Sequence, residues 1–261
     1  MTCDNEIRLA ELLAELRVSG RQQSGLTAEL IPPDAAAAYR VATGVAERLG
    51  WSVGGWKIAA NKPAMQAALR AKEPIMGRVF RDKIHDSGVM IDHAPLLWPV
   101  VEGELVVRLG SNLPARDQPY SREDIESAIS AIHVGIEIAE CRFVHDDAFP
   151  PLPAILADGS GSGHLIVGPE IKDWRLRGVL STDVVLSVDG VIRRNGNVDS
   201  AIGHPLTSVT WLANRLSIDG VGMVAGQVIS TGTCTGMLLA KAGTSCAANF
   251  QGLGTVEVSF Q

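Results

Sequence analysis

The chain has 261 residues, of which 46% are hydrophobic and 20% charged, and its formal net charge is −6. This balance predicts a globular protein and excludes an intrinsically disordered one. The negative charge and the lack of any run of Lys or Arg argue against nucleic-acid binding, because phosphate contacts need clustered basic residues. The length allows one large domain, or a core domain with a small appendage.

The N-terminus and one long uncharged stretch bear on localisation. The first twenty residues alternate charge with Leu and have no continuous apolar core, so we expect no signal peptide. Residues 220–240 could span a membrane by length, but they are too rich in Gly, Thr and Ser for a lipid-exposed helix. The four cysteines follow no zinc or disulfide spacing. We therefore expect a cytoplasmic protein with reduced thiols and no membrane partner.

The first third of the chain reads as mainly helical. Apolar residues at helical spacing predict a helix over 5–18, and a second helix over 34–49 is Ala-rich and stops at Gly50. A short strand over 51–58 and a helix over 64–71 follow. These patterns predict a helical N-terminal region, residues 1–90.

From Leu96 onward short strands dominate. We expect helices over 121–132 and 205–216, an ordered loop over 159–163, and strands over 100–109, 134–139, 165–167, 183–188, 191–194, 228–230 and 255–260. Asp189-Gly190 lies between two of these strands and is a strong signal for a two-residue hairpin. The pattern predicts an α+β protein in which residues 91–261 form a β-rich catalytic body.

Two carboxylates stand out in the strand over 100–109. Residues two apart on a strand share a face, so Glu102 and Glu104 point the same way, while Val or Leu occupies most other positions. A divalent cation would relieve the repulsion between two buried carboxylates, and oxygen ligands suit Mg²⁺, Mn²⁺ or Ca²⁺. The spacing alone is equally compatible with two surface glutamates on a solvated edge strand.

Glu137 and Lys57 favour the metal interpretation. Glu137 lies in an apolar strand with Gly135 and Ala139 on its own face, which leaves room beside it. Its alternative role is a buried ion pair with an arginine such as Arg142. Lys57 stands alone in a small apolar segment and would neutralise the charge left by three carboxylates and one divalent ion; alternatively, it reaches water at the end of a strand.

Taken in order, these segments closely resemble the hydratase/decarboxylase branch of the fumarylacetoacetate hydrolase superfamily. The resemblance covers the chain from about Asp34 and is carried by the following segments: Gly55-Trp-Lys-Ile58, Glu102-x-Glu104, Glu137-Ile with Arg142, Gly203-His-Pro-Leu206, Trp211-Leu-Ala-Asn214, Thr231-Gly-Thr233 and Phe250-Gln-Gly-Leu-Gly254. Each motif is weak by itself, but the ordered set is specific.

The resemblance implies a fold and a set of site residues. It implies a mixed β-roll core with a helical N-terminal region, and an Mg²⁺ or Mn²⁺ site. By this resemblance the metal ligands are Glu102, Glu104 and Glu137, the catalytic residues are Lys57 and Asp82, and the substrate-binding residues are Ser162 and Thr233.

Three departures from the family pattern lie near the expected substrate pocket. The third-ligand strand continues Glu140-Cys141-Arg142 instead of Asp-Ser-Arg. The loop 157–162 reads Ala-Asp-Gly-Ser-Gly-Ser instead of Ala-Asp-Asn-Ala-Ser-Ser, and Val100 stands where an Arg commonly precedes the Glu pair. These departures leave the side chain of the substrate open.

The resemblance also implies an activity. The expected reaction is the metal-dependent hydration of 2-hydroxypenta-2,4-dienoate (2-keto-4-pentenoate), or a close analogue, to a 4-hydroxy-2-oxo acid in aromatic catabolism. The alternatives are decarboxylation of a 4-oxalocrotonate-type diacid, for which Arg81 or Arg142 could hold the second carboxylate, an acylpyruvate-type C–C hydrolase, and a non-catalytic binding or partner subunit. Family members self-associate, so we expect a homo-oligomer, and a complex with a pathway enzyme is a further option.

Overall fold

The structure is a computed structural model that describes residues 2–175 and 178–261. Its α-helices are α1 (Cys3–Ser19), α2 (Ala35–Leu49), α3 (Pro63–Leu69), α4 (Arg122–Ala128), α5 (Leu152–Ala157), α6 (Val198–Ala201) and α7 (Pro205–Ile218). Three short 3-10 helices are η1 (Ala28–Leu30), η2 (Arg81–Lys83) and η3 (Val179–Ser181). In the described part of the chain no helix is long and apolar enough to span a bilayer.

The strands form two sheets. They are β1 (Val53–Ala59), β2 (Ile75–Phe80), β3 (Ile84–Asp86), β4 (Val89–Ile91), β5 (Val100–Leu109), β6 (Ile129–Ala139), β7 (His164–Glu170), β8 (Asp183–Val188), β9 (Val191–Asn197), β10 (Val228–Thr233), β11 (Leu238–Leu239), β12 (Ser245–Phe250) and β13 (Gly254–Phe260). The first sheet has the order β2-β1-β10-β5-β6-β7-β3, with β11 beside β5, and the second has the order β4-β13-β12-β8-β9. Only β1–β10, β3–β7 and β4–β13 are parallel pairs among these strands.

The first sheet curls until its two ends meet. Val79 of β2, Val228 of β10 and Leu165 of β7 belong to one buried cluster, although β2 and β7 lie far apart in the strand order. The loop 159–163 closes the gap, because the hydroxyls of Ser160 and Ser162 donate to the backbone carbonyls of β2. The result is a roll with an interior face, and it agrees with the predicted β-roll core.

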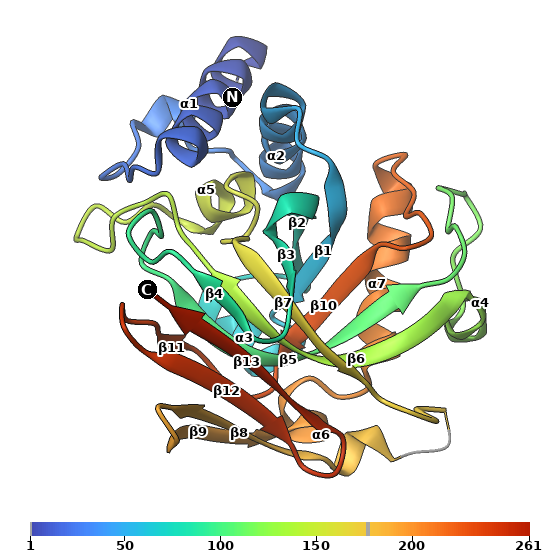
Figure 1. Cartoon of the computed structure of the whole chain (residues 1–261). Helices are drawn as coiled ribbons and strands as arrows, with labels where there is room; N and C mark the ends of the chain where they lie inside the picture. Colours follow the sequence, from blue (N-terminus) through green and yellow to red (C-terminus); the bar gives the residue numbers. More distant parts are fainter. Residues whose placement is uncertain (1, 176–177) are drawn as a thin grey trace.

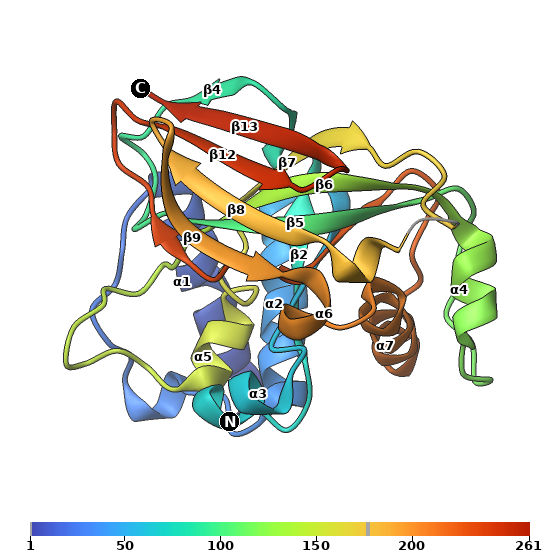
Figure 2. The same ribbon diagram turned by 90° about the horizontal axis from the view of Figure 1, so that it is seen from below.

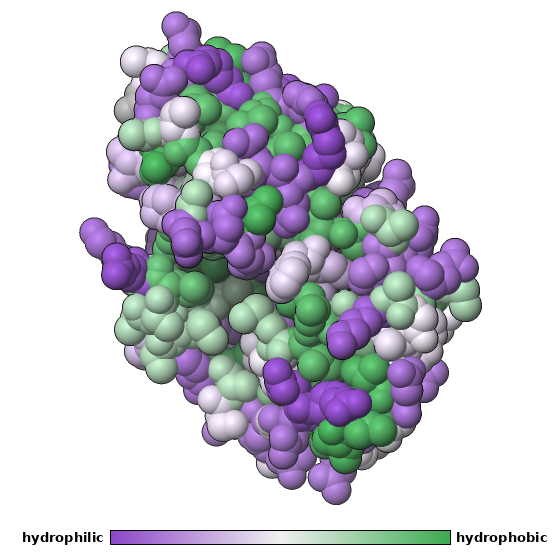
Figure 3. Space-filling model, turned by 90° about the vertical axis from the view of Figure 1, so that its left-hand side faces the viewer, coloured by the Kyte–Doolittle hydropathy of each residue, from purple (hydrophilic) through white to green (hydrophobic). Residues whose placement is uncertain are grey.

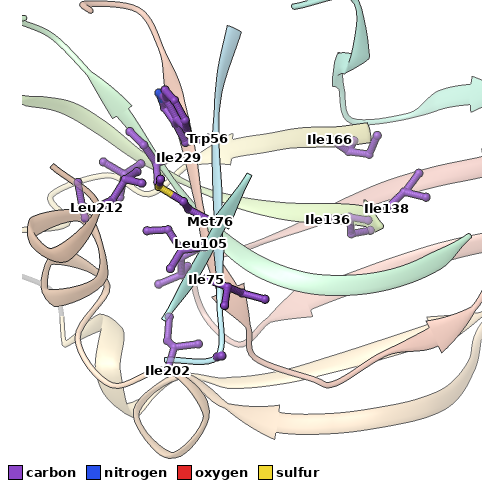
Figure 4. Close-up of a cluster of buried hydrophobic side chains, with 14 of the residues drawn as sticks. Trp56, Ile75, Met76, Leu105, Ile136, Ile138, Ile166, Ile202, Leu212 and Ile229 are labelled. Atoms are coloured by element: carbon purple, nitrogen blue, oxygen red, sulfur yellow. The ribbon is translucent and has the colours of Figure 1, made fainter. Parts of the chain in front are cut away.

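The outer face of the roll is covered by the second sheet and by helices. Figure 1 shows the second sheet below the first, on the side away from α1 and α2, and Figure 2 shows β8, β12 and β13 stacked against β5 and β6. Gly103 of β5 permits this close approach, since a Cβ there would lie 3.3 Å from the Cβ of Ala248. In the close-up of the core, Trp56, Met76 and Ile229 lie together, with Leu212 of α7 beside them (Figure 4).

Local sequence signals explain where several elements begin and end. The Thr2 hydroxyl caps α1, and Gly20 ends it in the left-handed conformation with φ 61°. Asp189 and Gly190 both have positive φ, 48° and 77°, as the predicted two-residue hairpin requires. The predicted helix over 121–132 is wrong in its second half, because the chain leaves α4 at Ala128 and enters β6.

The N-terminal helical part lies at one end of the roll. α1 and α2 pack on each other, and α2 packs on α5 (Figure 1). The space-filling view shows a recess between this part and the part formed by the sheets (Figure 3). The boundary predicted near residue 90 coincides with no break in the sheets, since β4 at Val89–Ile91 pairs with β13.

Candidate metal centre and active site

Three glutamates from two adjacent strands meet inside the roll. Glu102 of β5 is the register partner of Glu137 of β6, and Glu104 lies opposite Gly135. Register partners in antiparallel strands point to the same face, so the three side chains converge. One carboxylate oxygen of each lies within 4.8 Å of the others, and all three residues are buried. Residues 2–175 and 178–261 contain no other such group of His, Cys, Asp and Glu.

Lys57 reaches this group from the other side of the roll. It lies on β1, which is separated from β5 by β10. Its Nζ is 3.2 Å from Oε1 of Glu137, and the residue is 3% exposed. The alternative that Lys57 reaches water at a strand end is therefore wrong. Three carboxylates beside one ammonium leave the cluster with an excess of negative charge.

The intervening strand, β10, supplies neutral partners to the carboxylates. The Ser230 hydroxyl donates to Glu104 and lies 3.4 Å from Oε2 of Glu137. The backbone N–H of Gly232 donates to the same oxygen of Glu104 at 2.8 Å. Thr233 hydrogen-bonds to Glu102, and its hydroxyl oxygen accepts from the N–H of Gly236 at 2.9 Å. The glutamates are thus held in place from a third strand.

Burial and mutual repulsion alter the pKa values of this cluster. Burial, followed by the charge of Glu137, raises the pKa of Glu102 to about 7. The same two causes, in the same order, raise the pKa of Glu104 well above its ordinary value. Burial acts to lower the pKa of Lys57, but the three carboxylates outweigh it and the pKa is raised, so Lys57 is an ammonium at neutral pH.

The donor set fits a hard divalent cation. Oε1 of Glu137 is buried and has no partner beyond the ion pair with Lys57 among the described residues. Buried carboxylate oxygens with too few donors are a strong sign of a missing ligand. All three side chains offer oxygen, which Mg²⁺, Mn²⁺ and Ca²⁺ prefer. A cation bound here would supply the missing positive charge and serve as a Lewis acid.

The structure places the remaining predicted residues away from the carboxylates. Ser162 is buried in the loop that closes the roll, and its hydroxyl donates to the carbonyl of Arg78 at 2.6 Å. Asp82 is exposed in η2, beyond the end of β2, and among the residues described its side chain has no hydrogen bond or ion pair. The catalytic role of Asp82 and the substrate contact of Ser162 stay predictions.

Arg142 does not take either of the roles considered for it. Its guanidinium forms two hydrogen bonds from Nε to Asp158, at 2.7 and 2.9 Å, and the residue is 1% exposed. It therefore does not pair with Glu137, and it is not available to the second carboxylate of a diacid. Arg81 is exposed in η2, beside Asp82.

Two residues of the site were not predicted from the sequence. Ser230 and Gly232 contact Glu104 through β10, and a strand was expected at 228–230. Alternation along that strand places Val228 and Ser230 on one face, but it does not show which strand lies alongside. The missing information was the pairing of β10 with β5, with Ser230 opposite Val106.

Comparisons with known proteins agree with this geometry. Residues 72–261 match the model of the fumarylacetoacetate (FAA) hydrolase C-terminal domain. A 2-keto-4-pentenoate hydratase of Burkholderia vietnamiensis (strain G4 / LMG 22486) is 29% identical over 264 residues, covering 100% of this chain and 99% of the relative. A 4-oxalocrotonate decarboxylase of a Pseudomonas species is 27% identical over 97% of this chain and 96% of its own.

One solved structure matches over the full length. The 4-oxalocrotonate decarboxylase of Pseudomonas putida G7, complexed with magnesium and adipate, superposes with a TM-score of 0.89 at 25% identity. The match covers 100% of this chain and 99% of that one. The predicted resemblance to the hydratase/decarboxylase branch and the predicted fold are confirmed, and the chain belongs to the fumarylacetoacetate hydrolase family.

Proposed function

We propose that the protein is a divalent-metal-dependent hydratase that converts 2-hydroxypenta-2,4-dienoate, or a close analogue, to a 4-hydroxy-2-oxo acid. The observation that carries the proposal is the buried set of Glu102, Glu104 and Glu137, which has an excess of negative charge and lies beside Lys57. Support for the substrate class comes from full-length relatives named 2-keto-4-pentenoate hydratase.

The proposed cofactor is Mg²⁺ or Mn²⁺. Three carboxylates and no nitrogen or sulfur donor favour a hard cation, and a similar solved structure contains magnesium. When bound, the cation would stabilise the enolate charge that develops on a 2-keto acid. Glu102, Glu104 and Glu137 would hold it, with Ser230, Gly232 and Thr233 fixing their carboxylates.

Lys57 is the residue proposed to act on the substrate. Its ammonium is fixed by Glu137 and has little exposure, so it can hold the substrate carboxylate or deliver a proton inside a site that excludes water. Thr233 lies beside the carboxylates and is the better supported of the two predicted substrate-binding residues. Ser162 supports the loop that closes the roll.

A second candidate is decarboxylation of a 4-oxalocrotonate-type diacid. It is favoured by the TM-score of 0.89 to a decarboxylase in complex with adipate, a diacid. Such a substrate needs a cation for its second carboxylate, and Arg142 does not serve because Asp158 occupies it. The hydratase is therefore preferred, and turnover of the two substrates separates the candidates.

The decisive experiment measures turnover after removal and return of the metal. The chelator-stripped protein is given Mg²⁺ or Mn²⁺ together with 2-hydroxypenta-2,4-dienoate in H₂¹⁸O, and a diacid is tested in parallel. We expect metal-dependent loss of the dienoate absorbance and one ¹⁸O in the new hydroxyl. Release of CO₂ from the diacid without hydration of the dienoate would replace the hydratase with the decarboxylase. Turnover of neither substrate would leave a binding or partner protein.

Matched glutamate variants test the site within that assay. Glu104→Gln should lose metal-dependent turnover by at least about 10³-fold, because the ligand charge and the Gly232 contact are both weakened. Glu257→Gln, which changes an exposed glutamate on β13, should behave as wild type. Activity that survives in Glu104→Gln while the fold is intact would contradict the ligand assignment.

We also propose that the protein acts as a homo-oligomer in the cytoplasm. This rests on the behaviour of the family and on the expectations drawn from the sequence. Light scattering coupled to gel filtration would measure the oligomer directly, and co-purification with a pathway enzyme would reveal a mixed complex. A monomer at micromolar concentration would overturn the homo-oligomer.

A further inference from the structure

The short connection between β1 and α3 passes directly beside the candidate metal centre. Ala60, which follows β1, has the left-handed conformation with φ 58°, an uncommon conformation for a residue with a side chain. This bend brings Asn61 over β10, where its Nδ2 donates to the carbonyl of Thr231 at 2.5 Å. Strained conformations of this kind are often found at functional sites, where the surrounding structure maintains them.

Asn61 is coupled to a proposed metal ligand through one residue. Its amide packs on Gly232 so closely that a Cβ on Gly232 would overlap Nδ2 and lie 3.3 Å from Cγ. The N–H of the same Gly232 donates to Glu104 at 2.8 Å. The amide of Asn61 therefore lies in the layer of residues around the carboxylates.

The other amide atom of Asn61 lacks a partner. Oδ1 is buried and accepts no hydrogen bond from any described residue. Exchanging the two amide atoms does not help, because Oδ1 would then face the carbonyl oxygen of Thr231, and two acceptors repel. A buried amide oxygen is rarely left without a donor, so its position calls for an O–H or N–H supplied by a ligand or by water.

We propose that Oδ1 of Asn61 accepts a hydrogen bond from the hydroxyl at C4 of a 2-oxo acid, and from the water that becomes this hydroxyl. The proposal rests on the proposed hydratase function and adds a positioning and specificity residue to it. In the hydration, the water oxygen forms a bond to C4, the C3=C4 π bond opens, and C3 gains a proton. A neutral amide takes up no proton, so Asn61 orients the water and leaves proton transfer to other groups.

The hydroxyl preference is testable by binding alone. The ligands 4-hydroxy-2-oxopentanoate and 2-oxopentanoate differ only by the C4 hydroxyl, and their Kd values for the Mg²⁺-loaded protein are measured by calorimetry. We expect the wild type to prefer the hydroxy acid by about tenfold, the effect of one hydrogen bond. Asn61→Ala and Asn61→Leu should bind the two acids within about twofold of each other.

A matched control separates this role from bracing of the loop. Gln66 donates from Nε2 to the carbonyl of Ala60 at 2.9 Å, so Gln66→Ala removes a hydrogen bond from the same segment without touching the amide of Asn61. It should keep the hydroxyl preference. The affinity of the Asn61 variants for Mn²⁺ should stay within about threefold of wild type. A loss of metal affinity that accounts for the whole defect would show that Asn61 only supports Glu104, and would overturn the proposal.

Kinetics of the two steps give an independent measurement. Conversion of the dienol to the 3-enone consumes no water, whereas the second step adds it. Asn61→Ala should therefore slow hydration by about tenfold or more and change the first step by less than about twofold, so that the 3-enone accumulates. Equal slowing of both steps would contradict a role in holding water.

The outcomes keep the two proposals apart. A wild type that binds both acids equally, or Asn61 variants that retain the preference, overturns the role of Asn61 and leaves the hydratase standing. A hydroxyl preference without any turnover of the dienoate overturns the hydratase and leaves the hydroxyl site. Binding of neither acid overturns both.

Discussion

Two clusters of buried charge lie within this fold, and only one of them is balanced. In the first, Asp158 accepts the backbone N–H and the Nε of Arg142, and Arg17 lies 3.5 Å away. In the second, Glu102, Glu104 and Glu137 share one ammonium, that of Lys57. Both clusters are buried to a similar degree.

The difference shows how a structural ion pair can be told from a site that needs a ligand. In the first cluster every carboxylate oxygen has a donor, whereas Oε1 of Glu137 in the second lacks one beyond an ion pair. Burial alone does not distinguish them, since unpaired buried charge is costly wherever it occurs. The sign of the excess charge and the unfilled acceptors together indicate a cation site.

The largest expected effect breaks the balanced cluster. Asp158→Asn leaves Arg142 buried without its carboxylate, and we expect the free energy of unfolding to fall by about 3–5 kcal/mol. Urea denaturation measures this, and Mn²⁺ affinity of the folded fraction should be unchanged. An unchanged unfolding midpoint would show that the Arg142 pair is not a structural lock.

The same substitution in the unbalanced cluster should have the opposite sign. The raised pKa of Glu104 means that the folded protein holds this proton more tightly than the unfolded chain, so stability is lost as pH rises above about 4.5. At pH 8 without metal, Glu104→Gln should therefore raise the free energy of unfolding by about 1–2 kcal/mol. With Mn²⁺ present the order should reverse, because only the wild type gains binding energy.

Measurements with and without metal are both needed for that comparison. Destabilisation of Glu104→Gln in metal-free buffer would show that the carboxylate stabilises the fold by itself. The glutamates would then resemble the Asp158 cluster, and the interpretation as a cation site would fail.

A third group of charges, between β3 and β7, gives a pH-dependent effect of about 2 kcal/mol. Burial, then the charge of Lys83, lowers the pKa of His164 to about 3, and its Nδ1 lies 2.9 Å from Nε2 of His85. A histidine with a lowered folded pKa stabilises the protein above about pH 6.5, and this contribution is lost as pH falls. Between pH 7 and pH 5 the loss should be about 2 kcal/mol.

The histidine effect is isolated by comparison with a variant. Urea denaturation of wild type and His164→Asn at both pH values should show the extra loss at pH 5 only in the wild type. Metal-saturated protein is used, so that the glutamates do not titrate in the same range. Equal pH dependence in the two proteins would remove His164 as the cause.

The smallest expected effect comes from the neutral donors of the cation site. Ser230→Ala removes the hydroxyl that donates to Glu104, while the Gly232 N–H still contacts the same oxygen. We expect Mn²⁺ affinity to fall by about three- to tenfold, which corresponds to about one hydrogen bond. Ser127→Ala, in α4, is the control, because its hydroxyl donates only to the Glu123 carbonyl. Equal affinities in Ser230→Ala and wild type would show that Ser230 does not hold the ligand.

Much of the fold and of the site was predictable because it depends on local pattern. The strand over 100–109 has the predicted bounds, and the alternation along it placed Glu102 and Glu104 on one face. The failures arise where distant pairing decides. Residues 129–132 continue a helical pattern but are drawn into β6 by pairing with β5, and β12 contains Ala and Asn, which have low strand propensity.

The functional residues divide in the same way. Glu137 and Lys57 were recognisable as polar residues in apolar strands, and the structure places both at the centre. Asp82 was assigned by its place in a motif, and the structure leaves it exposed beyond β2. Asn61 became apparent only once its oxygen was seen to lack a donor, which depends on three-dimensional packing and on no sequence pattern.

The parallel pairing of β1 with β10 also has a consequence for biosynthesis. The hydrogen bond from Asn61 to Thr231 spans 170 residues, and β10 separates Lys57 from the glutamates of β5 and β6. A nascent chain on the ribosome carries Lys57 and all three glutamates long before β10 emerges, and contacts so distant in sequence form late. The acidic side chains therefore spend most of synthesis in water, and metal is expected to be captured only after the last quarter of the chain has been released.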